Sequence, residues 1–145
     1  IPEFRYAYNF DQNNPIHTDD LFNHIIKVIH LCDYDLITRF AALFHDLGKI
    51  NAKIIDAKGI FHFYGHEKES ALIAEEELRM LKASNETINS VKKIVKNHML
   101  IYEDVSDKTL KKLIIEMEYK NLKRLFNLFY ADLNSKGIKT KKFLE

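Results

Sequence analysis

The most informative stretch of the chain is Ala41-Ala42-Leu43-Phe44-His45-Asp46-Leu47-Gly48-Lys49. Its first half completes an apolar run over 34–44 that predicts one buried helix. A histidine and an aspartate follow this run directly, and Gly48 is expected to stop the helix. A polar His-Asp pair at the end of the most apolar helix indicates a site built on a helical core.

The overall composition is that of a helical globular protein. The 145 residues are 46% hydrophobic and 30% charged, with only 4 Gly and 2 Pro, which suits one mainly helical domain. No run approaches the roughly 20 apolar residues of a membrane span, and no secretory signal is visible at the N-terminus. The single cysteine, Cys32, cannot form an internal disulfide. Secreted, membrane and all-β classes are therefore excluded, and a cytoplasmic location is expected.

The net charge of +1 hides an asymmetry between the two halves of the chain. Residues 1–78 carry 7 Lys+Arg against 13 Asp+Glu, whereas residues 79–145 carry 15 against 8. The acidic half suits cation binding, and the basic half could contact phosphates. Many of these charges could instead simply solvate the outer faces of helices.

Apolar residues at three- and four-residue spacing predict an all-α fold, a single domain of five to seven helices over 18–134. Residues 1–17 are Asn-rich and aperiodic and are expected as an extended lead-in, and 135–145 are expected as a basic flexible tail. A turn at 56–59 indicates a short hairpin or flap over 50–64. The helices are expected over 18–31, 34–44, 66–81, 84–99, 121–134, and from Asp104 or Ser106 to 117.

Several polar side chains are predicted to face the interior of this fold. His24, His98 and Asp132 each lie on an apolar stripe, and His66 opens a helix just after a glycine. A lone histidine on such a stripe is usually a core residue, but an inward aspartate is costly unless a cation or strong donors compensate for it. Imidazoles and carboxylates are the ligand set of first-row divalent metals. A metal centre and a set of core histidines both remain open on spacing alone.

The order His24, His45-Asp46, Asp132 resembles the HD-domain phosphohydrolases, in which four metal ligands follow this order on a helical core. Longer strings over about 9–134 look like the HD domain of bacterial tRNA nucleotidyltransferases, the CCA-adding enzymes and poly(A) polymerases. These strings are Asn14-Pro15-Ile16-His17, His62-Phe63-Tyr64-Gly65-His66-Glu67 and Val95-Lys96-Asn97-His98-Met99.

The resemblance implies a set of metal ligands. His24, His45, Asp46 and Asp132 correspond to the ligands of the first metal, with Asp46 as the shared ligand if a second metal binds. His66 and His98 correspond to extra histidines that bind a second metal or contact substrate phosphate in relatives. The implied cofactor is one or two divalent ions, and the residues do not distinguish Mn, Ni, Mg, Fe, Co and Zn.

The resemblance also implies an activity and partners. The expected reaction is metal-assisted hydrolysis of a phosphoester in a nucleotide or an RNA 3′-end, with tRNA as a candidate partner and no membrane involved. Asp46 and Lys49 are the catalytic candidates, although Lys49 could equally be a solvated lysine. Lys92, Lys93 and Lys96 are expected to contact phosphates. His62 on the flap could reach the substrate or point outward, and the outward direction is favoured.

The sequence also lacks features that a whole tRNA nucleotidyltransferase would need. The nucleotidyltransferase core combines a Gly-Ser start with a paired Asp-x-Asp, and no such combination occurs here, so the chain is expected to be a fragment of a larger enzyme. A non-catalytic domain that positions tRNA is the main alternative to a hydrolase. A free-standing nucleotide hydrolase of another HD branch is a third reading. The oligomeric state is not indicated.

Overall fold

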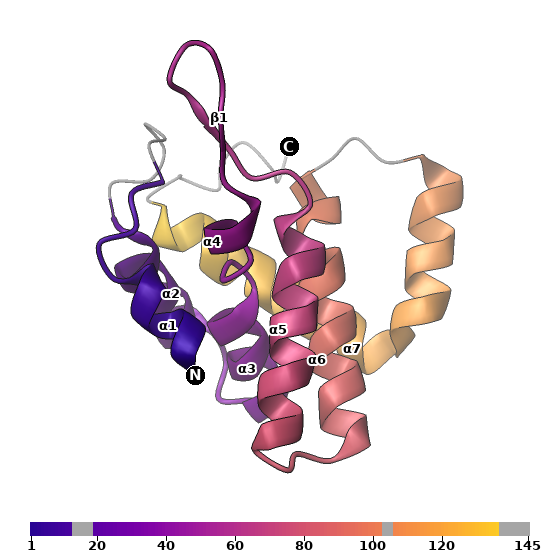
Figure 1. Ribbon diagram of the computed structural model, residues 1–145. Coiled ribbons are helices and arrows are strands. Elements are labelled where there is room, and N and C mark those ends of the chain that lie inside the picture. Colours follow the sequence, from indigo (N-terminus) through magenta and orange to yellow (C-terminus); the bar gives the residue numbers. More distant parts are fainter. Residues whose placement is uncertain (13–18, 103–105, 137–145) are drawn as a thin grey trace.

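The computed structural model describes residues 1–12, 19–102 and 106–136, most of which are helical (Figure 1). The α-helices are α1 (Pro2–Ala7), α2 (Leu21–Leu31), α3 (Leu36–Phe44), α4 (Lys49–Ala52), α5 (His66–Met80), α6 (Asn85–Asn97) and α7 (Asp107–Ser135), and a 3-10 helix, η1 (His98–Tyr102), follows α6. Two short strands, β1 (Ile54–Ile55) and β2 (Phe61–His62), pair antiparallel. The expected all-α fold with a hairpin within 50–64 is confirmed. In the described ranges, no helix is both long enough and apolar enough to cross a membrane.

The main helices begin where the sequence offers a capping side chain. Asp20, Asp35, Ser84 and Ser106 each accept a hydrogen bond from the backbone N–H three residues further on. These bonds satisfy donors that the first turn of a helix leaves unpaired. Because the caps define where each helix begins, they help to determine which face each helix turns toward the core.

The core surrounds α3, which contacts α2, α5, α6 and α7. The buried side chains of this core include Phe44, Leu47, Ile94, Leu125 and Leu128. α5 and α6 lie side by side as a helical hairpin, and the second part of α7 passes behind the bundle in Figure 1. The C-terminal end of α3, which carries His45 and Asp46, is therefore enclosed by several other helices.

The expected extended lead-in over 1–17 is wrong for its first residues, which form α1. Pro2 lies in the first turn, where a proline costs no backbone hydrogen bond. Phe4 then packs on Phe22 of α2 with ring centroids 4.9 Å apart. This contact stabilises a helix that is too short to be recognised from periodicity. Residues 13–18, including His17, lie outside the described ranges.

The helices expected to end at 117 and to begin at 121 meet within α7 at Glu118, whose backbone is not helical (φ 62°, ψ 150°), so the predicted interruption is confirmed as a kink between two helical parts. In Figure 1 the first part of α7, which precedes the kink, stands apart from α6 at the right of the view. Ser106 is the N-cap, while Asp104, the other expected cap, lies outside the described ranges. The expected tail over 135–145 is also wrong at its start, because Ser135 ends α7 and Lys136 is its C-cap.

Asp35 joins α3 to α7 and leads to a prediction about acid stability. Its carboxylate accepts from the backbone N–H of Thr38 and pairs with Arg124 at 2.9 Å. Partial burial alone would raise the pKa of Asp35, but the hydrogen bonds from Arg124 and Thr38 outweigh burial and lower the pKa to about 2. A lowered folded-state pKa contributes stability above the unfolded value, and this contribution is lost as pH falls from about 4 toward 2.

We therefore expect Asp35→Asn, which keeps a capping side chain, to lower the free energy of unfolding by about 1 kcal/mol at pH 7. The difference from the wild type should shrink as pH falls from about 4 to 2. Urea unfolding of both proteins at a series of pH values measures this difference in the free energy of unfolding. A difference that stays constant through this acid range would contradict the prediction.

Candidate metal centre

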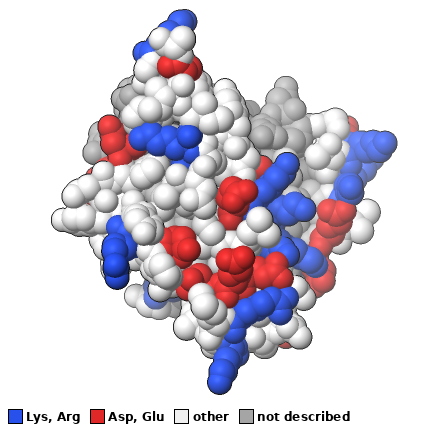
Figure 2. All heavy atoms as spheres, viewed as in Figure 1, with Lys and Arg blue, Asp and Glu red and all other residues white. Residues whose placement is uncertain are grey.

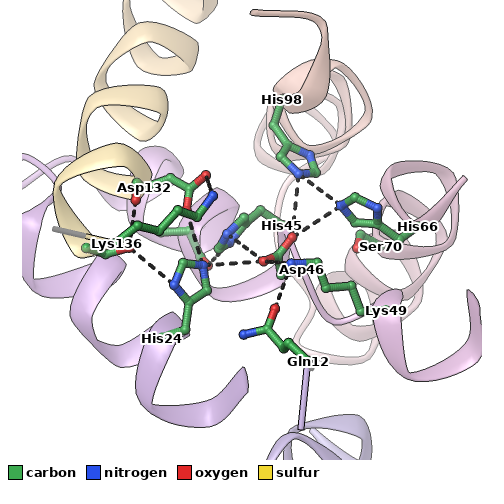
Figure 3. A network of polar contacts seen from close by, with 12 residues as sticks. Gln12, His24, His45, Asp46, Lys49, His66, Ser70, His98, Asp132 and Lys136 are labelled. Atoms are coloured by element: carbon green, nitrogen blue, oxygen red, sulfur yellow. Dashed lines mark hydrogen bonds and ion pairs between the residues drawn. The ribbon is translucent and has the colours of Figure 1, made fainter. Parts of the chain in front are cut away.

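Six buried side chains from five segments meet inside the bundle (Figure 3). His24 comes from the middle of α2, and Asp132 from the last turns of α7. The remaining four lie at helix ends. They are His45 and Asp46 after α3, His66 as the first residue of α5, and His98 between α6 and η1. All six residues predicted as metal ligands are thus brought together.

Asp46 lies at the centre, and its two carboxylate oxygens face different imidazoles. Oδ2 is 3.3 Å from Nε2 of His24 and 3.4 Å from Nε2 of His45. Oδ1 is 3.2 Å from Nε2 of His66 and 3.7 Å from Nε2 of His98. Two groups are compact enough to hold an ion, His24 with His45 and Asp46, and Asp46 with His66 and His98. Asp46 belongs to both.

Asp132 extends the first of these groups. Its Oδ1 lies 3.2 Å from Nε2 of His24. Asp132 therefore faces the same imidazole nitrogen as Asp46 does. In the second group, Nε2 of His66 lies 3.3 Å from Nε2 of His98.

Backbone carbonyls hold three of the four histidine rings. Nδ1 of His45, His66 and His98 lies 2.8, 2.9 and 2.7 Å from the carbonyl oxygen three residues earlier, in Ala42, Phe63 and Val95. A ring nitrogen facing a carbonyl must carry the proton, so in the neutral ring Nε2 has the free lone pair. This is the arrangement by which metal-ligating histidines are oriented.

The donor set fits a divalent cation. Nε2 of His45 is buried and makes no hydrogen bond among the described residues, and the group it faces, Oδ2 of Asp46 at 3.4 Å, is itself an acceptor. A buried lone pair that faces another acceptor is costly, and a cation between them would remove that cost. Two carboxylates and four imidazole nitrogens are also the donors that first-row divalent metals prefer.

Two lysines lie against the carboxylates. Nζ of Lys49 donates to Oδ2 of Asp46 at 2.6 Å and to Oε1 of Gln12 at 2.8 Å. Nζ of Lys136 donates to Oδ2 of Asp132 at 2.7 Å. Lys49 is buried, so the alternative of a solvated lysine is wrong.

The pKa shifts follow from these contacts. Burial alone would raise the pKa of Asp46, but the charges of His45 and Lys49 hold it well below its usual value. Burial likewise opposes the ionised form of Asp132, and His24 and Lys136 lower its pKa. Burial lowers the pKa of His98. For His24 burial acts in the same direction, yet the hydrogen bonds with Asp132 and Asp46 raise its pKa. The two carboxylates are therefore kept ionised.

Gly48 has a different role from the helix stop that the sequence suggested. Its backbone is helical (φ −63°, ψ −15°) and caps the start of α4. A Cβ atom at this position would lie 2.3 Å from the carbonyl oxygen of His66 and 2.5 Å from the backbone nitrogen of Ser70. The Gly48 N–H donates to Oγ of Ser70 at 2.9 Å. A glycine is thus required because α5 begins against this turn.

The remaining predicted site residues are engaged elsewhere. On the hairpin, Nε2 of His62 pairs with Oδ2 of Asp56 at 3.0 Å, and its ring stacks on Tyr64. On α6, Lys92 pairs with Glu75, while Lys93 is 3.6 Å from Glu118. These lysines and the exposed Lys96 line a surface groove of about 500 Å³ between α6 and α7.

Sequence reasoning missed Gln12, Ser135 and Lys136. Gln12 precedes any helix that can be recognised in the sequence, and Ser135 and Lys136 fall in the segment expected as a flexible tail. One signal was available, because Lys136 follows Asp132 by four residues, a spacing that places both on one helix face.

Comparison with known proteins identifies the family. A family model described as the HD domain matches residues 21–118. An A-adding tRNA nucleotidyltransferase from Deinococcus radiodurans is 30% identical over 106 residues, which are 69% of this chain and 24% of the relative. A CC-adding tRNA nucleotidyltransferase from Thermus thermophilus is 32% identical over 104 residues, 68% of this chain and 24% of the relative. The chain spans about a quarter of the length of these curated relatives. Because the family model covers well over half of its residues, the chain belongs to the HD domain family.

Proposed function

We propose that this chain is a metal-dependent phosphoester hydrolase domain of a tRNA nucleotidyltransferase-like protein, and that it acts on nucleotides or RNA ends. The observation that carries the proposal is the position of Asp46, which offers one oxygen to each of two imidazole pairs. A carboxylate shared in this way suits two neighbouring cations. Membership of the HD domain family supports the same conclusion.

Each half of the site would hold one ion. His24, His45, Asp46 and Asp132 would bind the first, and Asp46, His66 and His98 the second. A divalent cation there supplies Lewis acidity toward a phosphoryl oxygen and toward water. Mn, Ni, Mg, Fe, Co and Zn all accept these donors.

Lys49 would contact the substrate. Its ammonium group lies against Asp46 and is held there by Gln12. A phosphate that approached Asp46 would find this ammonium group beside it, and a non-bridging oxygen could replace the carboxylate as its partner. Lys49 would then neutralise charge on the phosphate during hydrolysis.

A second candidate function is a structural domain that positions tRNA. Lys49 and Lys136 already neutralise both buried carboxylates, so the cluster is charge-balanced by the chain's own residues. The two relatives are named as tRNA nucleotidyltransferases, and the part that matches this chain is only 24% of each. Under this alternative the six residues stabilise the fold and bind no catalytic ion.

Elemental analysis separates these functions. The protein is incubated with Mn²⁺, Ni²⁺, Zn²⁺ or Mg²⁺, desalted and analysed, and then assayed on cyclic nucleotides and phosphomonoesters. About one to two ions per chain together with metal-dependent phosphate release would support the hydrolase. Bound metal without hydrolysis of any substrate, or no metal at all, would favour the structural role.

We further propose that Lys92, Lys93 and Lys96 contact RNA phosphates. They lie on one side of α6 along the groove toward α7. On the face seen in Figure 2, acidic side chains lie among the basic ones, and Glu75 and Glu118 pair with two of these lysines. Contacts between these lysines and RNA phosphates are expected to be electrostatic and not specific for sequence.

Replacing these three lysines with Ala should reduce the slope of log Kd for tRNA against log salt concentration by about 2 to 3, because each of the three phosphate contacts releases about 0.7 to 0.9 of a counterion. The matched control replaces Lys27, Lys58 and Lys68, which are exposed elsewhere and carry the same total charge. Equal slopes for the two triple variants would exclude the α6 lysines from the RNA interface.

A further inference from the structure

The last turn of α7 closes over the first half of the candidate metal centre. We propose that Ser135 is a positioning residue for His24, and that together with Lys136 it presents His24 and Asp132 to a divalent cation. The metal-binding part of this inference rests on the proposed function. Both residues follow the range that the HD family model matches.

His24 differs from the other three histidines in how its ring is held. It lies within α2, where its own backbone N–H donates to the carbonyl of Asp20. Its Nδ1 lies 3.2 Å from Oγ of Ser135, a residue 111 positions later in the chain. The ring of His24 is thus contacted by a side chain from α7, whereas the other three rings face a backbone carbonyl of their own segment.

The direction of this hydrogen bond follows from the other contact of Ser135. Its hydroxyl donates to the backbone carbonyl of Asp132 at 2.7 Å. The hydroxyl proton is therefore engaged, and the oxygen is left to accept from Nδ1–H of His24. With the proton at Nδ1, Nε2 of the neutral ring carries the lone pair, and it faces Oδ2 of Asp46 and Oδ1 of Asp132.

Lys136 acts on the carboxylate in the same turn. Its Nζ contacts Oδ2 of Asp132, and the other oxygen, Oδ1, is the one that faces His24. The backbone N–H of Lys136 donates to the carbonyl of Leu133 at 3.2 Å, which closes the helix. The hydroxyl of Ser135 thus orients His24, and the ammonium of Lys136, seen beside Asp132 in Figure 3, orients that carboxylate.

The first test measures metal affinity in Ser135→Ala and Ser135→Thr. Removing a side chain that orients a histidine ligand typically weakens metal binding 10–100-fold. We expect Ser135→Ala to weaken Mn²⁺ and Zn²⁺ binding by about 10-fold in a competition titration with a chelator, and Ser135→Thr, which retains a hydroxyl, to restore most of it.

The matched control is Ser106→Ala, at the other end of the same helix. Ser106 caps α7, so this variant should lower the equilibrium constant of folding about five-fold, which corresponds to about 1 kcal/mol, and leave metal affinity unchanged. If Ser135→Ala lowers stability but, like the control, leaves metal affinity unchanged, Ser135 is merely structural and the proposal is wrong.

The second test does not depend on metal. In nitrogen-15 NMR of the metal-free protein, the Nδ1 proton of His24 should exchange slowly with water in the wild type and in Ser135→Thr. It should exchange quickly in Ser135→Ala. Failure of the wild type to bind metal would refute the proposed function alone, since proton exchange still tests Ser135. Equal exchange in all three proteins would overturn the role of Ser135.

Discussion

Replacing Asp46 with Asn is expected to abolish metal binding and hydrolysis together. The variant keeps the size of the side chain but removes the charge that both halves of the site share. Each half then retains neutral imidazoles, and only the first retains a carboxylate, that of Asp132. We expect bound metal to fall from about one to two ions per chain to near zero, and phosphate release to fall at least 100-fold.

Folding has to be separated from metal binding in this experiment. Asp46→Asn leaves the buried ammonium of Lys49 without its carboxylate, and breaking one side of a buried ion pair costs about 3–5 kcal/mol. The double variant Asp46→Asn with Lys49→Met removes both charges and should recover much of that loss. Because it still lacks the shared carboxylate, it should remain free of metal, as judged by elemental analysis beside a far-ultraviolet circular dichroism spectrum.

Asp56→Asn is the matched control. Asp56 also pairs with a histidine, His62, at 3.0 Å, but this pair is half-buried on the hairpin, outside the cluster of six buried side chains. The control should bind as much metal as the wild type. Normal metal content in Asp46→Asn, or an equal loss in Asp56→Asn, would refute the assignment of Asp46 as the shared ligand.

The inward-facing ligands could be predicted because periodicity and capping agree. His24, His98 and Asp132 lie on apolar stripes at three- and four-residue spacing, and a helix that buries such a stripe must bury its polar members too. Ser84, which the sequence offers as a cap, begins the helix that leads to His98. Both signals are local in the sequence, so one chain suffices to find them.

Features that depend on contacts between distant segments could not be predicted. Ser135 contacts His24 only because the second part of α7 returns to α2 after the kink at Glu118. Lys136 lies beyond the last apolar stripe, so its charge suggested a solvated tail. In each case the structural role comes from a tertiary contact, which periodicity does not encode.

Gly48 combines both kinds of information, and its replacement by Ala should strongly destabilise the fold. Gly48 is recognisable in the sequence, but it has to be a glycine because α5 packs against it. Its φ of −63° suits any amino acid, so backbone strain contributes nothing. The added methyl group would instead meet backbone atoms of His66 and Ser70 at 2.3 and 2.5 Å. Backbone within a packed helix cannot move aside as a flexible side chain can.

We expect Gly48→Ala to lower the free energy of unfolding by about 3 kcal/mol or more, measured by urea denaturation. The methyl group must push the first turn of α5 away, and this breaks the hydrogen bond from Gly48 to Ser70. It also moves His66, whose Nε2 is 3.2 Å from Asp46. Any protein that still folds should therefore lose the ion held by His66 and His98 before the one held by His24 and Asp132.

Gly59→Ala separates this steric effect from a general cost of replacing glycine. At Gly59 an added Cβ atom meets nothing within 4 Å, but φ is +77°, so only backbone strain of about 1–2 kcal/mol is expected. That variant should keep its metal, since the hairpin tip contributes no ligand. If Gly48→Ala were no more destabilising than Gly59→Ala, α5 would not approach the His45-Asp46 turn closely enough to position His66. The shared-carboxylate geometry would then lose its structural basis, because His66 reaches Asp46 only through that approach.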